Sequence, residues 1–296
     1  MHIIITGSLG HIGRPLTEEL LAKGHTLTVI SSSESRRAEI VKLGVRAAIG
    51  SLNDASFLTH TFTGADLLYA MVPPDMRHAS DLVGFYREVG ENYARAIREA
   101  GVPRVIYLSS FGAELDHGTG NILGAHYVEE TLKELAETDV TFIRPTSFYY
   151  NFLGFIGTIK ATGKILANYG GPNSIPLVSP RDIAAAISEE VDRPGEHRKI
   201  RYVYSDERTG DEVAQVLGAA IGKPDLEWVV VPDADMKRGL LGTGMPEGLA
   251  DNLTDLYASI HSGRLGREFQ ANKPAEAGNV KLEDYAPEFA AAYRNA

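Results

Sequence analysis

The first thirteen residues carry the clearest chemical signal in this chain of 296 residues. Three isoleucines at positions 3–5 lead into Gly7, Gly10 and Gly13, and the apolar pattern of a helix follows. Backbone N–H groups at a helix N-terminus favour an anion, and glycine leaves room for a pyrophosphate to approach them. The G-x-x-G-x-x-G spacing differs from the common G-x-G-x-x-G fingerprint, and a tight turn without a ligand is the alternative. The position between a strand and a helix favours a dinucleotide-binding loop.

The next informative residues follow a second predicted strand at 26–30. Dinucleotide folds place the adenosine ribose there, and an NAD site normally offers an Asp or Glu to the ribose 2′-hydroxyl. This chain has serines and then Arg36 instead. Hydroxyls and a guanidinium suit a 2′-phosphate, so we expect NADP, with NAD as the alternative, and Ser32, Ser33 and Arg36 as contacts. The competing interpretation is that residues 34–37 form only the solvated first turn of the next helix.

Two serines and a histidine–glutamate pair are the candidates for chemistry on a substrate. Ser109 and Ser110 end a predicted strand, at the sheet edge where open α/β folds bind ligands; there they either contact a substrate or cap a helix. His126 and Glu130 are four residues apart on the predicted helix at 125–136 and can share one face. An imidazole can donate to a carbonyl oxygen, but such pairs are also common on helix surfaces without any catalytic role.

Alternating strands and helices must position these side chains. Apolar runs predict strands near residues 3–5, 26–30, 45–49, 66–72, 105–110 and 140–144, with helical patterns between them. This alternation predicts a Rossmann-type α/β fold with a doubly wound parallel sheet.

The alternation is lost beyond Pro145. The aromatic stretch at 147–153 follows a strand end, so it either lines the pocket or packs in the core. A helix that begins near Arg181 and a strand at 200–204 are expected to return to the sheet. We therefore predict an NAD(P)-binding domain over residues 1–150, with 178–204 packed on it. The remainder, 151–177 and 205–296, is predicted to form a smaller, mostly helical substrate-binding region.

Composition excludes several classes of function. The chain has no cysteine, which rules out disulfides, thiolate nucleophiles and cysteine-ligated metals. The net charge is −10, and no basic run could track a nucleic-acid backbone. There is no run of eighteen apolar residues and no H-x-x-x-H metal-ligand pair. We expect a cytoplasmic protein without metal, membrane or direct nucleic-acid partner, and leave a homodimer open.

Several motifs together resemble one known family. They are residues 6–13, 100–102 ahead of the strand at 105–110, His126 with Glu130, 142–145 with Asn151, 178–184 and, less specifically, 245–251. The pattern resembles the NmrA-like group of atypical short-chain dehydrogenases/reductases, and within it the NAD(P)H:quinone oxidoreductase-like members. The resemblance covers most of the chain. It implies a Rossmann fold, an NAD(P) cofactor and a small-molecule acceptor such as a quinone.

One departure bears on mechanism. The superfamily that the chain resembles typically uses a Tyr-x-x-x-Lys pair, but here Tyr127 is followed four residues later by Thr131, and Lys133 lies off that face. Quinone reduction requires fewer catalytic side chains from the protein, because hydride transfer is the chemistry of the cofactor. We therefore expect an NADPH-dependent quinone-type oxidoreductase. The alternative is a non-catalytic NAD(P)-sensing regulatory protein of the NmrA type.

The predicted site follows from these arguments. We predict His126, Tyr127 and Ser110 as catalytic residues. Besides the three glycines and the three residues near the ribose, the predicted cofactor contacts are Ser8, Leu9, His11, Ile12, Ser51, Leu52, Ala70, Met71, Val72, Ser109 and Tyr149.

Overall fold

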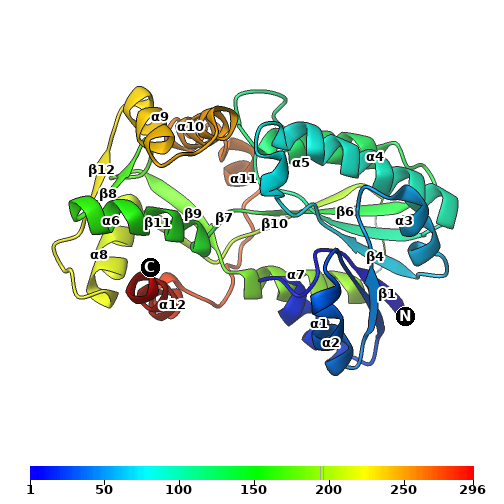
Figure 1. Cartoon of the computed structure of the whole chain (residues 1–296). Coiled ribbons are helices and arrows are strands. Elements are labelled where there is room, and N and C mark those ends of the chain that lie inside the picture. Colours follow the sequence, from blue (N-terminus) through cyan, green and yellow to red (C-terminus); the bar gives the residue numbers. More distant parts are fainter. Residues whose placement is uncertain (194, 196) are drawn as a thin grey trace.

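A parallel sheet forms the centre of the protein, seen in a computed structural model that describes residues 1–193, 195 and 197–296 (Figure 1). Within that part, seven strands pair in the order β10-β6-β5-β4-β1-β2-β3, and every pairing is parallel. The predicted doubly wound sheet is therefore confirmed. The strands are β1 (His2–Ile5), β2 (Thr26–Ser31), β3 (Arg46–Ile49), β4 (Leu67–Ala70), β5 (Arg104–Leu108), β6 (Asp139–Pro145) and β10 (Lys199–Val203).

Helices cover both faces of this sheet (Figure 1). One layer holds α3 (Ala55–Phe62), α4 (Leu82–Ala100) and α5 (Ile122–Lys133), and the other holds α1 (Gly13–Ala22), α2 (Arg37–Lys42) and α7 (Pro180–Asp192). Successive side chains of β1 enter different cores: Ile4 packs with the first layer, and Ile3 and Ile5 with the second. Burial on both faces explains why these strands are continuous apolar runs in the sequence.

The smaller lobe is mostly helical, as predicted, and also contains short strands. In the described part it contains two small sheets, β11-β9-β7 and β12-β8. Its strands are β7 (Ser147–Phe148), β8 (Lys164–Ala167), β9 (Ser174–Val178), β11 (Asp206–Thr209) and β12 (Glu227–Val230). Its helices are α6 (Ile156–Thr162), α8 (Gly210–Ala220), α9 (Asp233–Gly242), α10 (Glu247–His261), α11 (Arg267–Ala271) and α12 (Leu282–Asn295).

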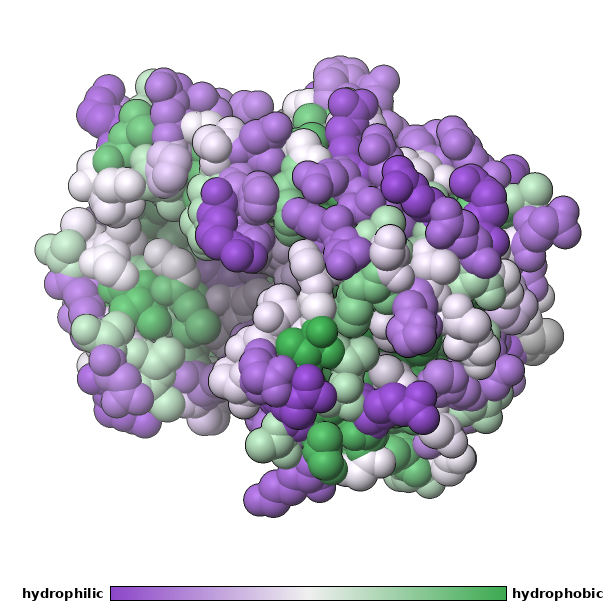
Figure 2. Space-filling view, turned by 45° about the vertical axis from the view of Figure 1, so that its right-hand side comes forward, coloured by the Kyte–Doolittle hydropathy of each residue, from purple (hydrophilic) through white to green (hydrophobic). Residues whose placement is uncertain are grey.

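A third apolar core holds the smaller lobe together. Phe155 and Tyr169 pack against the ring of Trp228, whose indole N–H donates to the carbonyl of Tyr169 at 2.6 Å. Between this lobe and the Rossmann part the surface is deeply hollowed (Figure 2). Among the described helices, none has the length and apolar character needed to cross a bilayer.

Candidate active site

The glycine loop joins β1 to α1 through close backbone contacts. Gly7 has a φ of +82°, and a Cβ there would lie 2.5 Å from Sδ of Met71. A Cβ on Gly13 would lie 2.1 Å from the carbonyl oxygen of Ser8, so the loop can close on the helix only with glycine there. Gly10 differs, because it is exposed and its Cβ would meet only the Gly7 carbonyl at 3.5 Å. Its open side leaves room for a ligand.

The start of α1 offers hydrogen-bond donors to an anion. Ile12 occupies the N-cap, and within the described chain no side chain caps the helix and no acidic residue lies in its first turn. Ser8 has a φ of +59°, and its buried hydroxyl has no partner among the described residues. Free N–H groups and a positive helix end are the features that bind a phosphate.

A cavity of about 230 Å³ lies beside this loop, where the Rossmann fold holds adenosine. Predicted contacts Ser32, Ser51 and Leu52 line it together with Gly7 and Ser8.

Asn92 of α4 is buried and donates to the carbonyl of Leu52, one of the residues that line this cavity, at 3.4 Å. Asp75 and Arg77 line the same cavity and were missed, because they follow β4 in a loop without regular pattern. Ser33 and Arg36 stand outside the lining, and the Arg36 guanidinium is paired with Glu39 at 2.7 Å.

A second cavity, of about 310 Å³, lies at the carboxyl ends of β4, β5 and β6 and reaches the smaller lobe. The backbone of Met71 is fixed there: its N–H donates to Thr6 Oγ1 at 2.8 Å and its carbonyl accepts from the Tyr93 hydroxyl at 2.7 Å. Among the predicted residues, Ile12, Met71, Val72, Ser109, Ser110 and, from the aromatic stretch, Phe148, Tyr150, Asn151 and Phe152 line this cavity.

Two phenols and one amide from other elements also line this second cavity, which is called the acceptor cavity below. They are Tyr86, Asn121 and Tyr257, and no sequence motif marks them because they come from distant helices and a loop. Burial raises the pKa of the Tyr86 and Tyr257 phenols to about 12, so both are neutral at physiological pH. The cavity is therefore aromatic, with neutral hydrogen-bonding groups at its margin.

The two serines that end β5 differ in their hydrogen bonds. The Ser110 hydroxyl donates to the carbonyl of Phe111 at 3.0 Å. The Ser109 hydroxyl donates to Oε1 of Glu129 at 2.5 Å. Ser110 is thus bound to a neutral group and Ser109 to a carboxylate.

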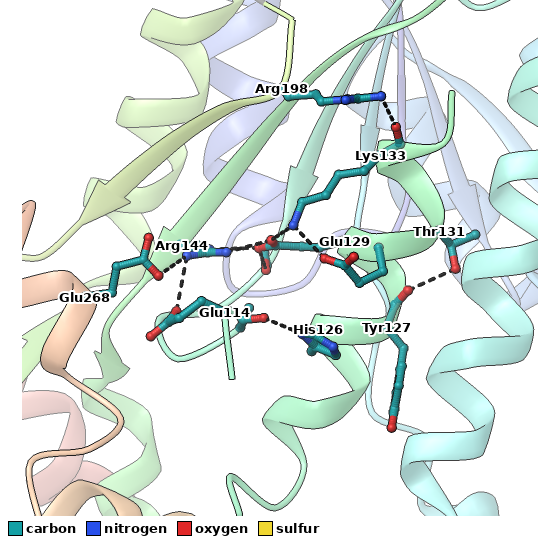
Figure 3. Close-up of polar contacts among 12 residues, drawn as sticks. Glu114, His126, Tyr127, Glu129, Thr131, Lys133, Arg144, Arg198 and Glu268 are labelled. Carbon is teal, nitrogen blue, oxygen red and sulfur yellow. Dashed lines mark hydrogen bonds and ion pairs between the residues drawn. The ribbon is translucent and has the colours of Figure 1, made fainter. Parts of the chain in front are cut away.

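Glu129 belongs to a buried ionic network (Figure 3). Arg144 donates to both of its carboxylate oxygens, from Nε at 2.9 Å and from Nη2 at 2.7 Å. Nη1 of the same guanidinium contacts Glu114 at 3.2 Å and Glu268 at 3.1 Å. Burial, with Glu268 nearby, raises the pKa of Glu114 to about 7.

His126 and Tyr127 lie outside the lining of the acceptor cavity. Nδ1 of His126 contacts the carbonyl of Ala113 at 2.9 Å, and the Tyr127 ring lies beneath the Arg87 guanidinium of α4 at 3.6 Å. Figure 3 shows the two side chains leaving α5 in directions away from Glu129. Neither lines the acceptor cavity, because α5 turns Ile122 and Ala125 toward it. Their catalytic role stays a prediction, and the lining of the cavity gives it no support.

Other predicted contacts point into the core. Tyr149 is fully buried and its hydroxyl donates to the carbonyl of Val280 at 3.0 Å, so Tyr150 takes the place expected for it at the cavity. Ala70 and Leu9 are buried in the apolar cores on the two sides of the sheet. His11 stacks on Tyr150 with ring centroids 4.7 Å apart, at the edge of a separate groove between α1 and α12.

The fold and this pair of cavities define a Rossmann protein with a dinucleotide-type loop beside an aromatic cavity. The NmrA-like family matches residues 1–284, and the chain belongs to that family. This confirms the predicted resemblance.

Two curated relatives are similar over most of their length. The chain is 26% identical to an NAD(P)H azoreductase of Xenophilus azovorans over 259 residues, which cover 86% of each protein. It is 25% identical to quinone oxidoreductase 2 of Escherichia coli over 269 residues, 89% of each.

Solved structures share the fold. The NADPH-dependent quinone oxidoreductase of Escherichia coli complexed with NADPH superimposes with a TM-score of 0.78 at 21% identity, covering 97% of this chain and 99% of that one. NmrA, a negative transcriptional regulator in complex with NADP, gives a TM-score of 0.72 at 16% identity, with 97% and 94% covered. Both an oxidoreductase and a regulator therefore have this architecture.

Proposed function

We propose that this protein is an NADPH-dependent oxidoreductase that reduces a quinone or a similar conjugated aromatic acceptor. The observation that carries the proposal is the continuity between the glycine loop and the aromatic cavity. Ile12 belongs to the loop and lines the cavity, and Met71 lines the cavity while its sulfur packs against Gly7. A dinucleotide held at the loop has its reactive end directed toward that cavity. The azoreductase and quinone oxidoreductase relatives support the same class of acceptor.

The cavity can hold a flat ring and stabilise negative charge on it. NADPH, when bound, supplies the hydride. Phe148, Phe152 and Tyr257 provide the aromatic walls that a planar acceptor packs against. Ser110 can turn its hydroxyl from the neutral Phe111 carbonyl to an acceptor oxygen, where a donor stabilises developing charge.

The adenosine end supports NADP over NAD. The residues after β2 include no acid that would bind a ribose 2′-hydroxyl before Glu34, and Ser32 lines the adenosine cavity. Arg36 lies in the same loop in an exposed pair with Glu39, and such pairs contribute little to stability. Its guanidinium is therefore available to a 2′-phosphate, which offers more negative charge.

A second candidate function is NAD(P) sensing. Its specific support is that the Tyr-x-x-x-Lys pair is absent and that His126 and Tyr127 lie off the cavity. NmrA, a regulator, has the same fold. A sensor would bind the cofactor and transmit its occupancy without turnover.

Oxidation of NADPH with a panel of small quinones and an azo dye tests the proposal. We expect turnover that depends on the acceptor and falls about tenfold or more in Ser110→Ala, because one oxyanion donor is lost. A His126→Ala/Tyr127→Phe double variant is the matched control and should lose less than about fivefold. Tight NADPH binding without turnover across the panel would favour the sensor.

Cofactor preference is measured in the same assay with NADH. We expect Arg36→Ala to lose most of the preference for NADPH, because a charge-assisted contact with the 2′-phosphate is removed. A variant that keeps the full preference would contradict this assignment and direct attention to Arg77, the other arginine near the adenosine cavity.

A further inference from the structure

The Ser109 side chain lines the acceptor cavity, but its hydroxyl hydrogen is already used in a hydrogen bond to Glu129. Its side chain lines the cavity and is 7% exposed, whereas Glu129 behind it is 0% exposed. The hydroxyl donates to Glu129 Oε1 at 2.5 Å. A serine hydroxyl has one hydrogen and two lone pairs, so what remains for a ligand is a lone pair.

Two cations keep Glu129 in its acceptor role. Arg144, itself 1% exposed, donates to both carboxylate oxygens, and Nζ of Lys133 lies 3.5 Å from Oε2. An ionised carboxylate has no hydrogen to give, so the hydrogen between it and Ser109 can come only from the serine. Figure 3 shows Glu129 between the two cationic side chains.

The carbonyl oxygen of an acceptor does not readily take the Ser109 hydrogen away from Glu129. A hydrogen bond to a carboxylate is roughly twice as strong as one between neutral groups. Ser110, whose hydroxyl donates to the neutral Phe111 carbonyl, can exchange that partner for a ligand oxygen, but Ser109 would lose a charge-assisted bond inside a buried network. The two neighbouring serines therefore offer a ligand opposite hydrogen-bonding roles: Ser110 can donate a hydrogen bond and Ser109 accepts one.

Two further polar residues belong to this cavity. Asn121 and Thr146 line it, and Oδ1 of Asn121 and Oγ1 of Thr146 are buried without a hydrogen-bond partner in the part of the chain that the structure describes. Buried polar atoms are normally paired, so these two residues bring unpaired polar groups to the margin of the cavity. An amide oxygen requires a donor, as the Ser109 oxygen does.

We propose that Glu129 is a positioning residue that fixes Ser109 as a hydrogen-bond acceptor, so that the cavity selects conjugated acceptors carrying an N–H or O–H group on the ring. Amino-substituted quinones are the simplest members of this class. The inference rests on the proposed function for the kind of molecule bound, and it adds the substituent that the cavity recognises. Glu129 itself does not touch the ligand and acts through Ser109.

Binding of two naphthoquinones tests the inference without requiring turnover. The 2-amino and 2-methyl derivatives of 1,4-naphthoquinone have substituents of similar size, but only the amino group donates. Their dissociation constants are measured by calorimetry with NADP⁺ present, so that reduction cannot occur. We expect the wild-type protein to prefer the amino compound, and Ser109→Ala to reduce that preference about threefold to tenfold, the value of one neutral hydrogen bond. Ser109→Ala leaves the ion pair between Glu129 and Arg144 in place.

The Glu129→Gln variant tests whether Glu129 fixes the direction of the Ser109 hydroxyl hydrogen. The glutamine amide can donate to the Ser109 oxygen, which frees the serine hydrogen to turn into the cavity. We expect the same loss of preference for the amino compound while the methyl compound still binds. A purely structural role of Glu129 would weaken both compounds equally and leave their ratio unchanged.

The possible results separate this inference from the proposed function. An unchanged ratio in both variants overturns the inference, even if quinone turnover is observed. A ratio that falls in both variants supports it, even if NADPH is not oxidised and the proposed function fails, whereas a ratio that falls in Ser109→Ala alone overturns the positioning role of Glu129. A wild-type protein that binds neither compound overturns it as well.

Discussion

The network around Arg144 holds more negative than positive charge, and we predict that replacing Glu114 stabilises the protein at alkaline pH. Burial first, and then the nearby Glu268, raise the pKa of Glu114 from an ordinary value of 4.5 to about 7. The folded state therefore holds a proton that the unfolded chain releases at lower pH. Stability from this group is present below pH 4.5 and is lost as pH rises through 7.

The size of the effect follows from the shift. Each pKa unit corresponds to about 1.4 kcal/mol, which gives an upper limit of roughly 3 kcal/mol for the change from 4.5 to 7. The Glu114 side chain is 22% exposed, so water screens part of the repulsion and we expect about 1–2 kcal/mol. Glu114→Gln has no proton to lose, and its amide oxygen can still accept from Arg144.

Urea unfolding at several pH values measures the difference. Glu114→Gln should match the wild-type free energy of unfolding near about pH 5 and exceed it by about 1–2 kcal/mol near pH 8. Glu288→Gln, a change of equal charge on the exposed side of α12, is the control and should show no such pH dependence. The same difference between Glu114→Gln and wild type at both pH values, or a less stable variant at pH 8, would refute the account.

Two further predictions concern the loop and the α7 motif. Gly10→Ala should unfold like the wild type but bind NADPH at least about tenfold more weakly, whereas Gly13→Ala should also lose about 2 kcal/mol of stability, because its Cβ meets the backbone of Ser8. Equal stability of the two variants would contradict this reading. Asp182→Ala should lower the free energy of unfolding by about 2–3 kcal/mol, because the hydroxyl of Ser205 at 2.5 Å and the N–H of Val280 at 3.1 Å lose their acceptor. Urea unfolding checks it, and a loss below about 0.5 kcal/mol would show that these donors find other partners.

The parallel sheet was predictable because its elements are locally specified. The strands of the sheet are buried on both faces and so appear as short apolar runs, and helix ends carry their own signals. Gly101, for instance, ends α4 with a φ of +65°, and Asp54 begins α3 by accepting from the N–H of Phe57 at 3.0 Å. The glycine loop could be located because it lies between two such elements.

The smaller lobe was less predictable because its strands depend on partners far along the chain. β9 contains Pro176, which argues against a strand when it is read alone. The pairing of β9 with β11 is fixed only in three dimensions, where Pro176 lies opposite Glu207. A local signal is present in the same lobe: Thr209 and Glu212 have the T-x-x-E spacing of a capping box, and this box begins α8.

The face that a helix turns toward a site is the hardest feature to obtain from sequence. Tyr149 and Tyr150 are adjacent in one short 3-10 helix, η3 (Tyr149–Phe155), so they point different ways, and only the packing decides that Tyr150 faces the cavity. Likewise, spacing correctly groups His126 with Glu130 but does not say whether that face is inside.

One residue, Arg144, does indicate in the sequence which face of α5 is buried. Arg144 stands at the end of the apolar strand predicted at 140–144, and a buried guanidinium requires a carboxylate partner. The preceding helix offers Glu129 and Glu130, and only one of two neighbouring residues can face the sheet. The partner of Arg144 is Glu129, and its inward position places Tyr127, two residues earlier, on the opposite side of α5. A charged residue in a core strand thus indicates which face of the neighbouring helix is buried, and here that face leads directly to Ser109.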